Sequence, residues 1–185
     1  AAHIIAGCAD QLKPHWIEAL LEFFEQHPRL MRERTQDANG FTRIHGDMNP
    51  FNVLIPIEGH RPIYLIDRQP FDWSLKTWLG VSDFGFALVL DCVTETRRAL
   101  EQPILRYYHE QLRAHGVEGY AWEQLWNDYR LVVAGCLYVI TEWNRDELNV
   151  DFMVHWLPML QRVMTAFDDL DCAGLWRKRS EGNDA

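Results

Sequence analysis

The residues whose types and spacing best suit chemistry lie in one short stretch, residues 44–55. It carries Asp47 and, five positions later, Asn52, and a second aspartate, Asp67, follows fifteen residues after Asn52. Oxygen ligands suit a hard cation such as magnesium, and a carboxylate can also accept a proton from a hydroxyl. The pattern therefore predicts an aspartate that deprotonates an alcohol, beside an amide and a second carboxylate that hold magnesium.

Two short apolar runs, residues 53–55 and 63–66, must position these side chains. Both runs contain β-branched residues, and the segment between them contains two prolines and a glycine. This composition predicts two β-strands joined by a turn. Such a hairpin brings Asn52 and Asp67 side by side at its open end, which a helix does not do at this separation.

The rest of the chain has a mainly helical pattern, so we expect an α+β, mostly helical fold. Apolar side chains recur at helical spacing over these ranges: 13–26, 82–92, 94–115, 122–143 and 152–167. We expect the first helix to end at His27-Pro28, because proline disfavours a helical conformation in the residue before it. Ser82 is a candidate N-cap, and residues 68–80 lack a clear period, which is typical of a loop.

Composition and charge exclude several classes of protein. The 185 residues are 48% hydrophobic and 24% charged, which is typical of one globular domain. The net charge of −9 argues against nucleic acid or an anionic membrane as a partner. The longest apolar run, Leu131–Ile140, is too short to span a bilayer, and no signal peptide is recognisable. Four scattered cysteines without a CxxC pair indicate reduced thiols in a cytoplasmic protein.

The run His45-Gly46-Asp47, then Asn52, then Asp67 after the next strand, resembles the catalytic core of the aminoglycoside phosphotransferase and choline kinase family. That family has a protein-kinase-like fold. The match covers residues 44–85, and the helical remainder is compatible with the family's C-terminal lobe. The resemblance implies that residues 1–185 form such a lobe, with a small β-hairpin that carries the catalytic loop.

The resemblance also implies an ATP- and Mg²⁺-dependent transfer of the γ-phosphoryl group to a hydroxyl of a small molecule. Asp47 would orient and deprotonate the acceptor hydroxyl, and Asn52 and Asp67 would bind magnesium and, through it, the nucleotide. His45 would hold the loop by packing and hydrogen bonding. Asp83 would begin a helix and accept hydrogen bonds from the catalytic loop.

One motif and two substitutions qualify this resemblance. Asp83-Phe84-Gly85 spells the metal-binding tripeptide of protein kinases, but it opens a helical run, so the metal role is expected at Asp67. Phe51 occupies a position that is often glycine in the family. Arg68-Gln69 follow the metal aspartate where Trp and an acidic residue often stand, so a second acidic ligand is absent there.

Four residues are candidates for contact with the acceptor. Trp73 and Trp78 follow the metal aspartate in the predicted loop, where an aromatic ring can stack on a substrate. Glu142 and Asp146 follow the longest predicted helix, and in relatives of the resembled family acidic residues here can face a cationic acceptor. The acceptor class stays open between an aminoglycoside, an amino alcohol and a sugar-like alcohol. For these four residues the alternative is a structural role, in the core or at a solvated helix end.

A nucleotide-binding N-terminal lobe is expected to be absent from this chain. The chain has only three lysines and no glycine-rich phosphate loop. It also starts without methionine, so we expect it to be part of a longer protein and to turn over ATP poorly or not at all by itself. Apolar surface left by a missing lobe would seek a partner, which points to a homodimer as one assembly.

Two rival functions stay open. A non-catalytic kinase-like module would bind a ligand or partner through its helical face; the missing lobe favours it, and the intact Asp47, Asn52 and Asp67 argue against it. A magnesium-dependent hydrolase would use the same carboxylates with water as the nucleophile. That reaction calls for a denser acidic cluster than this sequence contains.

Overall fold

The computed structural model describes residues 1–67 and 75–180, and these fall into two compact units. The first unit combines residues 1–38 with residues 130–185, and the second comprises residues 39–129. The chain is α+β and mostly helical, with two small antiparallel sheets, as predicted. Among the described residues, no helix is both long and apolar enough to cross a membrane.

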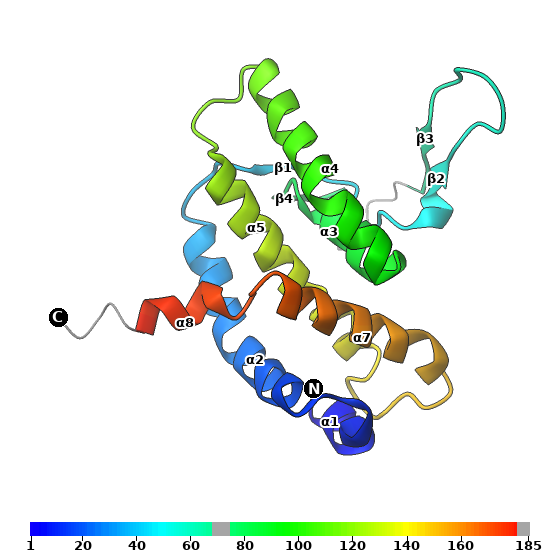
Figure 1. The fold of residues 1–185 in the computed structure, drawn as a ribbon, viewed down its shortest axis with the longest axis vertical. Helices are drawn as coiled ribbons and strands as arrows, with labels where there is room; N and C mark the ends of the chain where they lie inside the picture. The colour runs from blue at the N-terminus through cyan, green and yellow to red at the C-terminus, as the bar shows by residue number, and fades with distance from the viewer. Residues whose placement is uncertain (68–74, 181–185) are drawn as a thin grey trace. The chain divides into compact units, whose positions relative to one another are not determined.

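Within its described residues, the first unit has helices as its only regular secondary structure (Figure 1). Its elements are α1 (Ala2–Cys8), η1 (Ala9–Gln11), α2 (Pro14–Arg34), the end of α5 (Trp122–Gly135), α6 (Leu137–Glu142), α7 (Met153–Asp169) and α8 (Gly174–Ser180). Their apolar faces meet in a core in which Phe23, Leu137 and Trp156 are fully buried. The predicted helix over 152–167 is confirmed, with Pro158 inside it.

The prediction that the first helix ends at His27-Pro28 is wrong. α2 continues to Arg34 with Pro28 inside it. The imidazole of His27 is buried, donates a hydrogen bond from Nε2 to Leu131 O (2.9 Å) and accepts one from the Tyr138 hydroxyl (3.2 Å). Burial and these two hydrogen bonds offset the backbone hydrogen bond that proline removes.

The second unit holds both sheets and the predicted site (Figure 1). Its elements are β1 (Phe41–Arg43), η2 (Pro50–Asn52), β2 (Val53–Leu54), β3 (Tyr64–Leu65), β4 (Thr77–Leu79), α3 (Ser82–Phe86), the π-helical η3 (Ala87–Asp91), α4 (Thr94–Ala114) and the start of α5. The predicted hairpin is confirmed, because β2 pairs with β3 antiparallel, with Val53 opposite Leu65.

Three further boundaries differ from the prediction. Residues 77–79 are a strand rather than loop, because they pair with β1, whose Phe41 lies opposite Leu79. Ser82 is the first residue of α3 and not its N-cap, and no side-chain capping bond is present there. The predicted helix over 122–143 is interrupted at Cys136, directly after a glycine, a poor helix former.

Candidate functional site

The loop before β2 is held in shape by its own side chains. Pro50 occupies the first position of η2, where its missing N–H costs nothing. Asn49 caps this turn, since its Oδ1 accepts a hydrogen bond from Phe51 N (3.0 Å). Its backbone oxygen accepts a second bond from Asn52 N (3.0 Å), so the four residues 49–52 form one compact turn.

Asp47 and Asn52 lie together at the end of this turn. Nδ2 of Asn52 donates to the backbone oxygen of Asp47 (2.9 Å) and to its Oδ2 (3.1 Å). Nδ2 of Asn49 donates to the other carboxylate oxygen, Oδ1 (3.0 Å). Two amides therefore orient the Asp47 carboxylate, which is half-buried, while Asn52 is buried.

Asp83 binds the backbone of the same loop just before Asp47. Its Oδ2 accepts a hydrogen bond from His45 N (2.8 Å), and its Oδ1 accepts one from Gly46 N (2.9 Å). Gly46 has a φ of +84°, a conformation that glycine adopts without strain, and it lets two successive N–H groups reach one carboxylate. The predicted hydrogen bonds from the loop to Asp83 are thus present.

His45 connects the loop to the hairpin through hydrogen bonds of its imidazole ring. Its buried ring donates from Nε2 to the backbone oxygen of Ile66 (2.9 Å) and accepts at Nδ1 from Asp47 N (3.3 Å). These two bonds assign the proton to Nε2. With both nitrogens engaged by the backbone, His45 holds the loop in place, as expected of a structural residue.

Asp67 lies at the open end of the hairpin, which also carries Asn52. Ile66 N donates to Asn52 O (3.0 Å), so Asp67 directly follows the residue that pairs with Asn52. Its side chain is exposed. It has a φ of +61°, a sparsely populated conformation for a residue with a side chain, and such residues gather at functional sites.

The donor set fits magnesium in chemical type. Because Nδ2 of Asn52 faces two oxygens of Asp47, its Oδ1 points elsewhere, and it accepts no hydrogen bond within residues 1–67 and 75–180. Asn52 and Asp67 carry oxygen atoms of the kind that Mg²⁺ prefers as ligands. Among the described residues no three His, Cys, Asp or Glu side chains gather as metal ligands. A site here would depend on the amide and the carboxylates beside it.

The four candidates for contact with the acceptor fall in different parts of the chain. Trp73 lies outside the described residues. Trp78 belongs to β4 rather than to a loop, and its ring lies beside Phe41 (centroids 6.2 Å apart). Glu142 and Asp146 belong to the first unit, where Arg145 forms ion pairs with both (2.7 and 3.7 Å).

Sequence reasoning missed two residues around the site. Asn49 orients the carboxylate of Asp47. An asparagine directly before a proline at a helix start is a capping signal, and this signal could have identified Asn49. Tyr108 of α4 lies near Asp83. Burial, and then the negative charge of Asp83, raise the pKa of its phenol. No sequence signal connects these two positions.

In comparisons with known proteins, no family model, no curated protein and no solved structure matches this chain. Its function is therefore inferred from its own residues and their geometry.

Proposed function

We propose that this protein is an ATP- and Mg²⁺-dependent phosphotransferase that acts on a hydroxyl of a small molecule, with a kinase-like C-terminal lobe as its fold. The observation that carries the proposal is the double hydrogen bond from Asn52 Nδ2 to Asp47 (2.9 and 3.1 Å). It joins a carboxylate and an amide at the end of the hairpin where Asp67 also stands. Phosphoryl transfer depends mainly on such positioning and on charge neutralisation.

Each residue has a distinct task in this proposal. Asp47, oriented by two amides, accepts the proton of the acceptor hydroxyl as that oxygen attacks phosphorus. Oδ1 of Asn52 and the carboxylate of Asp67 hold Mg²⁺, which when bound neutralises charge on the transferred phosphoryl group. Asp83 and His45 are positioning residues, since they contact the loop backbone.

The test measures ATP consumption by the full-length protein with Mg²⁺ and a panel of aminoglycosides, amino alcohols and sugars. We expect one acceptor class to stimulate turnover and to yield a phosphorylated alcohol. Asp47→Asn should lower kcat by about 10²- to 10⁴-fold, the usual contribution of a general base. Asp67→Asn should raise the Mg²⁺ concentration needed for half-maximal activity. Glu118→Gln, an exposed residue of the same unit, serves as the control and should retain activity.

Product analysis separates the proposal from its rivals. Phosphate released to water without any acceptor would identify a hydrolase instead. No turnover with any acceptor, together with no Mg²⁺-dependent nucleotide binding, would reject the proposal and favour a non-catalytic binding module. Full activity in Asp47→Asn would reject the role given to that residue.

A further inference from the structure

Gly80 joins β4 to α3 at a point where the chain has no room for a side chain. It is buried, and its N–H donates to Gly40 O (2.8 Å). A Cβ added to Gly80 would overlap the hydroxyl oxygen of Tyr108 and would lie 3.0 Å from Cγ2 of Thr42. The backbone of Gly80 is outside the left-handed region. The close approach of Tyr108, and not an unusual conformation, therefore requires a glycine here.

Tyr108 of α4 contacts the chain on both sides of Asp83. Its hydroxyl lies at Gly80, three positions before Asp83, and its ring lies against Phe84, one position after it (centroids 5.0 Å apart). α3 and α4 accordingly lie side by side (Figure 1). Burial, and then the negative charge of Asp83, raise the pKa of the Tyr108 phenol, which keeps it neutral beside the carboxylate. Tyr108 thus supports the whole segment 80–84 from one side.

The segment 80–84 is the part of the second unit that holds the loop of the candidate site. The carboxylate of Asp83 accepts hydrogen bonds from His45 N (2.8 Å) and Gly46 N (2.9 Å). Asp47 follows directly in the chain. A shift of the segment 80–84 would therefore lengthen both bonds and release the backbone that carries Asp47.

We propose that Tyr108 is a positioning residue of the candidate site: its hydroxyl, seated on Gly80, fixes the segment 80–84 so that Asp83 stays on the two N–H groups before Asp47. The contact acts through shape, because a residue larger than glycine would displace it. This inference deepens the proposed phosphotransferase function and rests on it for the activity measurement alone. The hydrogen bonds of Asp83 can be followed without any activity.

The test is a pair of complementary substitutions in the full-length protein, followed by amide hydrogen exchange of His45 and Gly46. Gly80→Ala places a methyl group where the hydroxyl lies, and it should speed exchange of both amides about 10- to 100-fold, the protection given by a hydrogen bond to a charged group. Tyr108→Phe removes the hydroxyl and should have a smaller effect, because the ring still lies against Phe84. The double variant Gly80→Ala/Tyr108→Phe should regain most of the protection, since the methyl group then occupies the space of the hydroxyl.

Two comparisons show whether the effect is local and specific. The amide of Leu125, which is bonded to Ala121 O (3.0 Å), belongs to the same unit and should exchange as in the wild type. Gly80→Ala/Thr42→Ser relieves the other close neighbour of the added methyl group and should not restore protection. Tyr107→Phe is the matched control for the tyrosine, because Tyr107 is 64% exposed, and it should change nothing.

Activity gives a second measurement. The kcat of Gly80→Ala should fall by up to about 10²-fold, the effect of a misplacement of about 1 Å, and the double variant should recover. KM should rise less than kcat falls, since the displaced group acts in the transition state. An inactive wild type would reject the proposed function, and the two amides would still decide the present inference.

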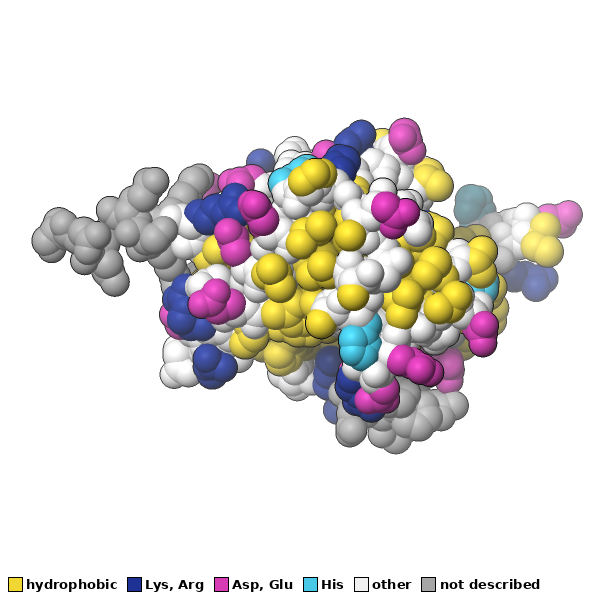
Figure 2. Space-filling model, turned by 90° about the horizontal axis from the view of Figure 1, so that it is seen from below, with side chains coloured by type: hydrophobic (Ala, Val, Ile, Leu, Met, Phe, Trp, Pro, Cys, Tyr) yellow, Lys and Arg dark blue, Asp and Glu magenta, His cyan; other side chains and the backbone are white. Residues whose placement is uncertain are grey.

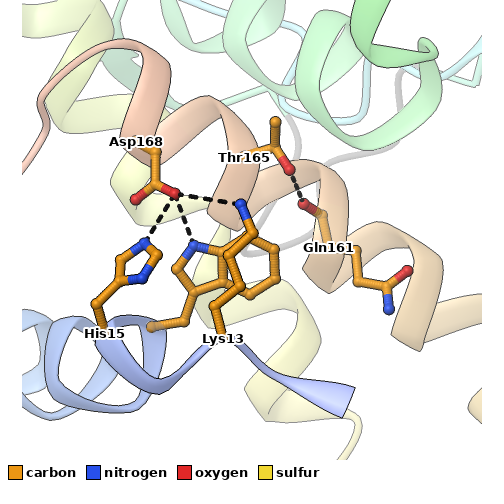
Figure 3. A network of polar contacts seen from close by, with 6 residues as sticks. Lys13, His15, Gln161, Thr165 and Asp168 are labelled. Atoms are coloured by element: carbon orange, nitrogen blue, oxygen red, sulfur yellow. Dashed lines mark hydrogen bonds and ion pairs between the residues drawn. The ribbon is translucent and has the colours of Figure 1, made fainter.

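Two control substitutions lie in the first unit. Asp168 joins α7 to α2, since it accepts hydrogen bonds from Trp16 Nε1 (2.8 Å) and His15 Nε2 (3.0 Å) and lies 3.9 Å from Lys13 Nζ (Figure 3). Asp168→Ala should lower the stability of that unit and leave the two amides protected. Figure 2 views the molecule from the side of α1 and α2 and shows hydrophobic side chains gathered over that face. Leu21 of α2 is 59% exposed, and Leu21→Ala should change neither exchange nor kcat.

Three results would overturn the proposal: amides that stay protected in Gly80→Ala, a double variant with Tyr108→Phe that is no better than Gly80→Ala, or equal rescue by Thr42→Ser. If Gly80→Ala fails to fold, Tyr108→Ala replaces it. That variant removes the ring as well as the hydroxyl, so it should speed exchange of the two amides and leave that of Leu125 unchanged. Unchanged protection of the two amides in Tyr108→Ala would equally reject the role given to Tyr108.

Discussion

Asp83 accepts hydrogen bonds from two consecutive backbone N–H groups, those of His45 and Gly46 (2.8 and 2.9 Å). These groups belong to the loop that carries Asp47, the proposed proton acceptor, one residue after Gly46. The carboxylate thus sets the position of Asp47 without contacting it. At the scale of single residues, the candidate site depends as much on these positioning bonds as on the groups that would react.

Substitution of Asp83 should therefore reduce stability. Asp83→Ala leaves two partly buried N–H groups without their charged acceptor, and we expect a loss of about 2–3 kcal/mol in the free energy of unfolding. Asp83→Asn keeps one acceptor oxygen and should lose about half as much. Urea unfolding measures both values. Equal stability of wild type and Asp83→Ala would show that these bonds contribute nothing.

Substitution of the neighbouring residue, Ser82, should not reduce stability. Ser82 is fully buried, and its Oγ has no hydrogen-bond partner among the described residues. Ser82→Ala removes a buried polar group that gains nothing in the fold, so we expect stability to stay unchanged or to rise by up to about 1 kcal/mol. The same urea series tests this, and a clear loss of stability would reveal a hydrogen bond made by this hydroxyl.

Two glycines of the second unit show how elements constrain the chain. Gly40 precedes β1 with a φ of +80°, its oxygen accepts a bond from Gly80 N (2.8 Å), and an added Cβ would lie 2.7 Å from the Tyr120 ring. Gly59, between β2 and β3, has a φ of +77° but open space around it. Both glycines therefore adopt a left-handed backbone conformation, but only Gly40 is packed closely against another side chain.

This difference is measurable as a pair of substitutions. Gly59→Ala should cost about 1–2 kcal/mol, because the left-handed conformation is unfavourable for a residue with a side chain. Gly40→Ala should cost about 1–3 kcal/mol more, because the methyl group also displaces the Tyr120 ring. Chemical denaturation of the two variants gives the difference. Equal losses would mean that the Tyr120 ring moves aside freely.

At the scale of the whole molecule, the first unit brings together the two terminal segments of the chain. His27 is one of the residues that joins them, through its bond to Leu131 O (2.9 Å). Burial lowers the pKa of its imidazole, although the bond to Leu131 acts in the opposite direction. The neutral form is therefore the one that this part of the fold accommodates.

The lowered pKa makes stability depend on pH. The unfolded chain protonates His27 near its ordinary pKa of about 6.5, while the folded protein does so only at lower pH. The contribution of His27 to stability should therefore be constant above about pH 6.5 and fall below it, by up to about 1.4 kcal/mol per pH unit, until the lowered native pKa is reached. Urea unfolding between pH 7.5 and 5.5 measures the slope. His27→Gln should flatten it, whereas His60→Gln, an exposed control, should not.

The sequence by itself determined the features that depend on near neighbours. The hairpin of β2 and β3, the helix α4 and the spacing of Asp47 and Asn52 follow from strand, helix and turn patterns within a few residues. The orientation of Asp47 by Asn52 is of this local kind, because a single turn joins them.

Only the tertiary structure decided features whose stabilising partner lies far along the chain. α2 passes Pro28 because His27 is buried against Leu131, which outweighs a local stop signal. β4 is a strand because β1 supplies its hydrogen bonds. Asp83 reaches the loop across 38 positions of sequence, and no local pattern shows which backbone groups its oxygens will accept. Contacts of that range are formed when the chain packs, and their energy is absent from any short stretch of sequence.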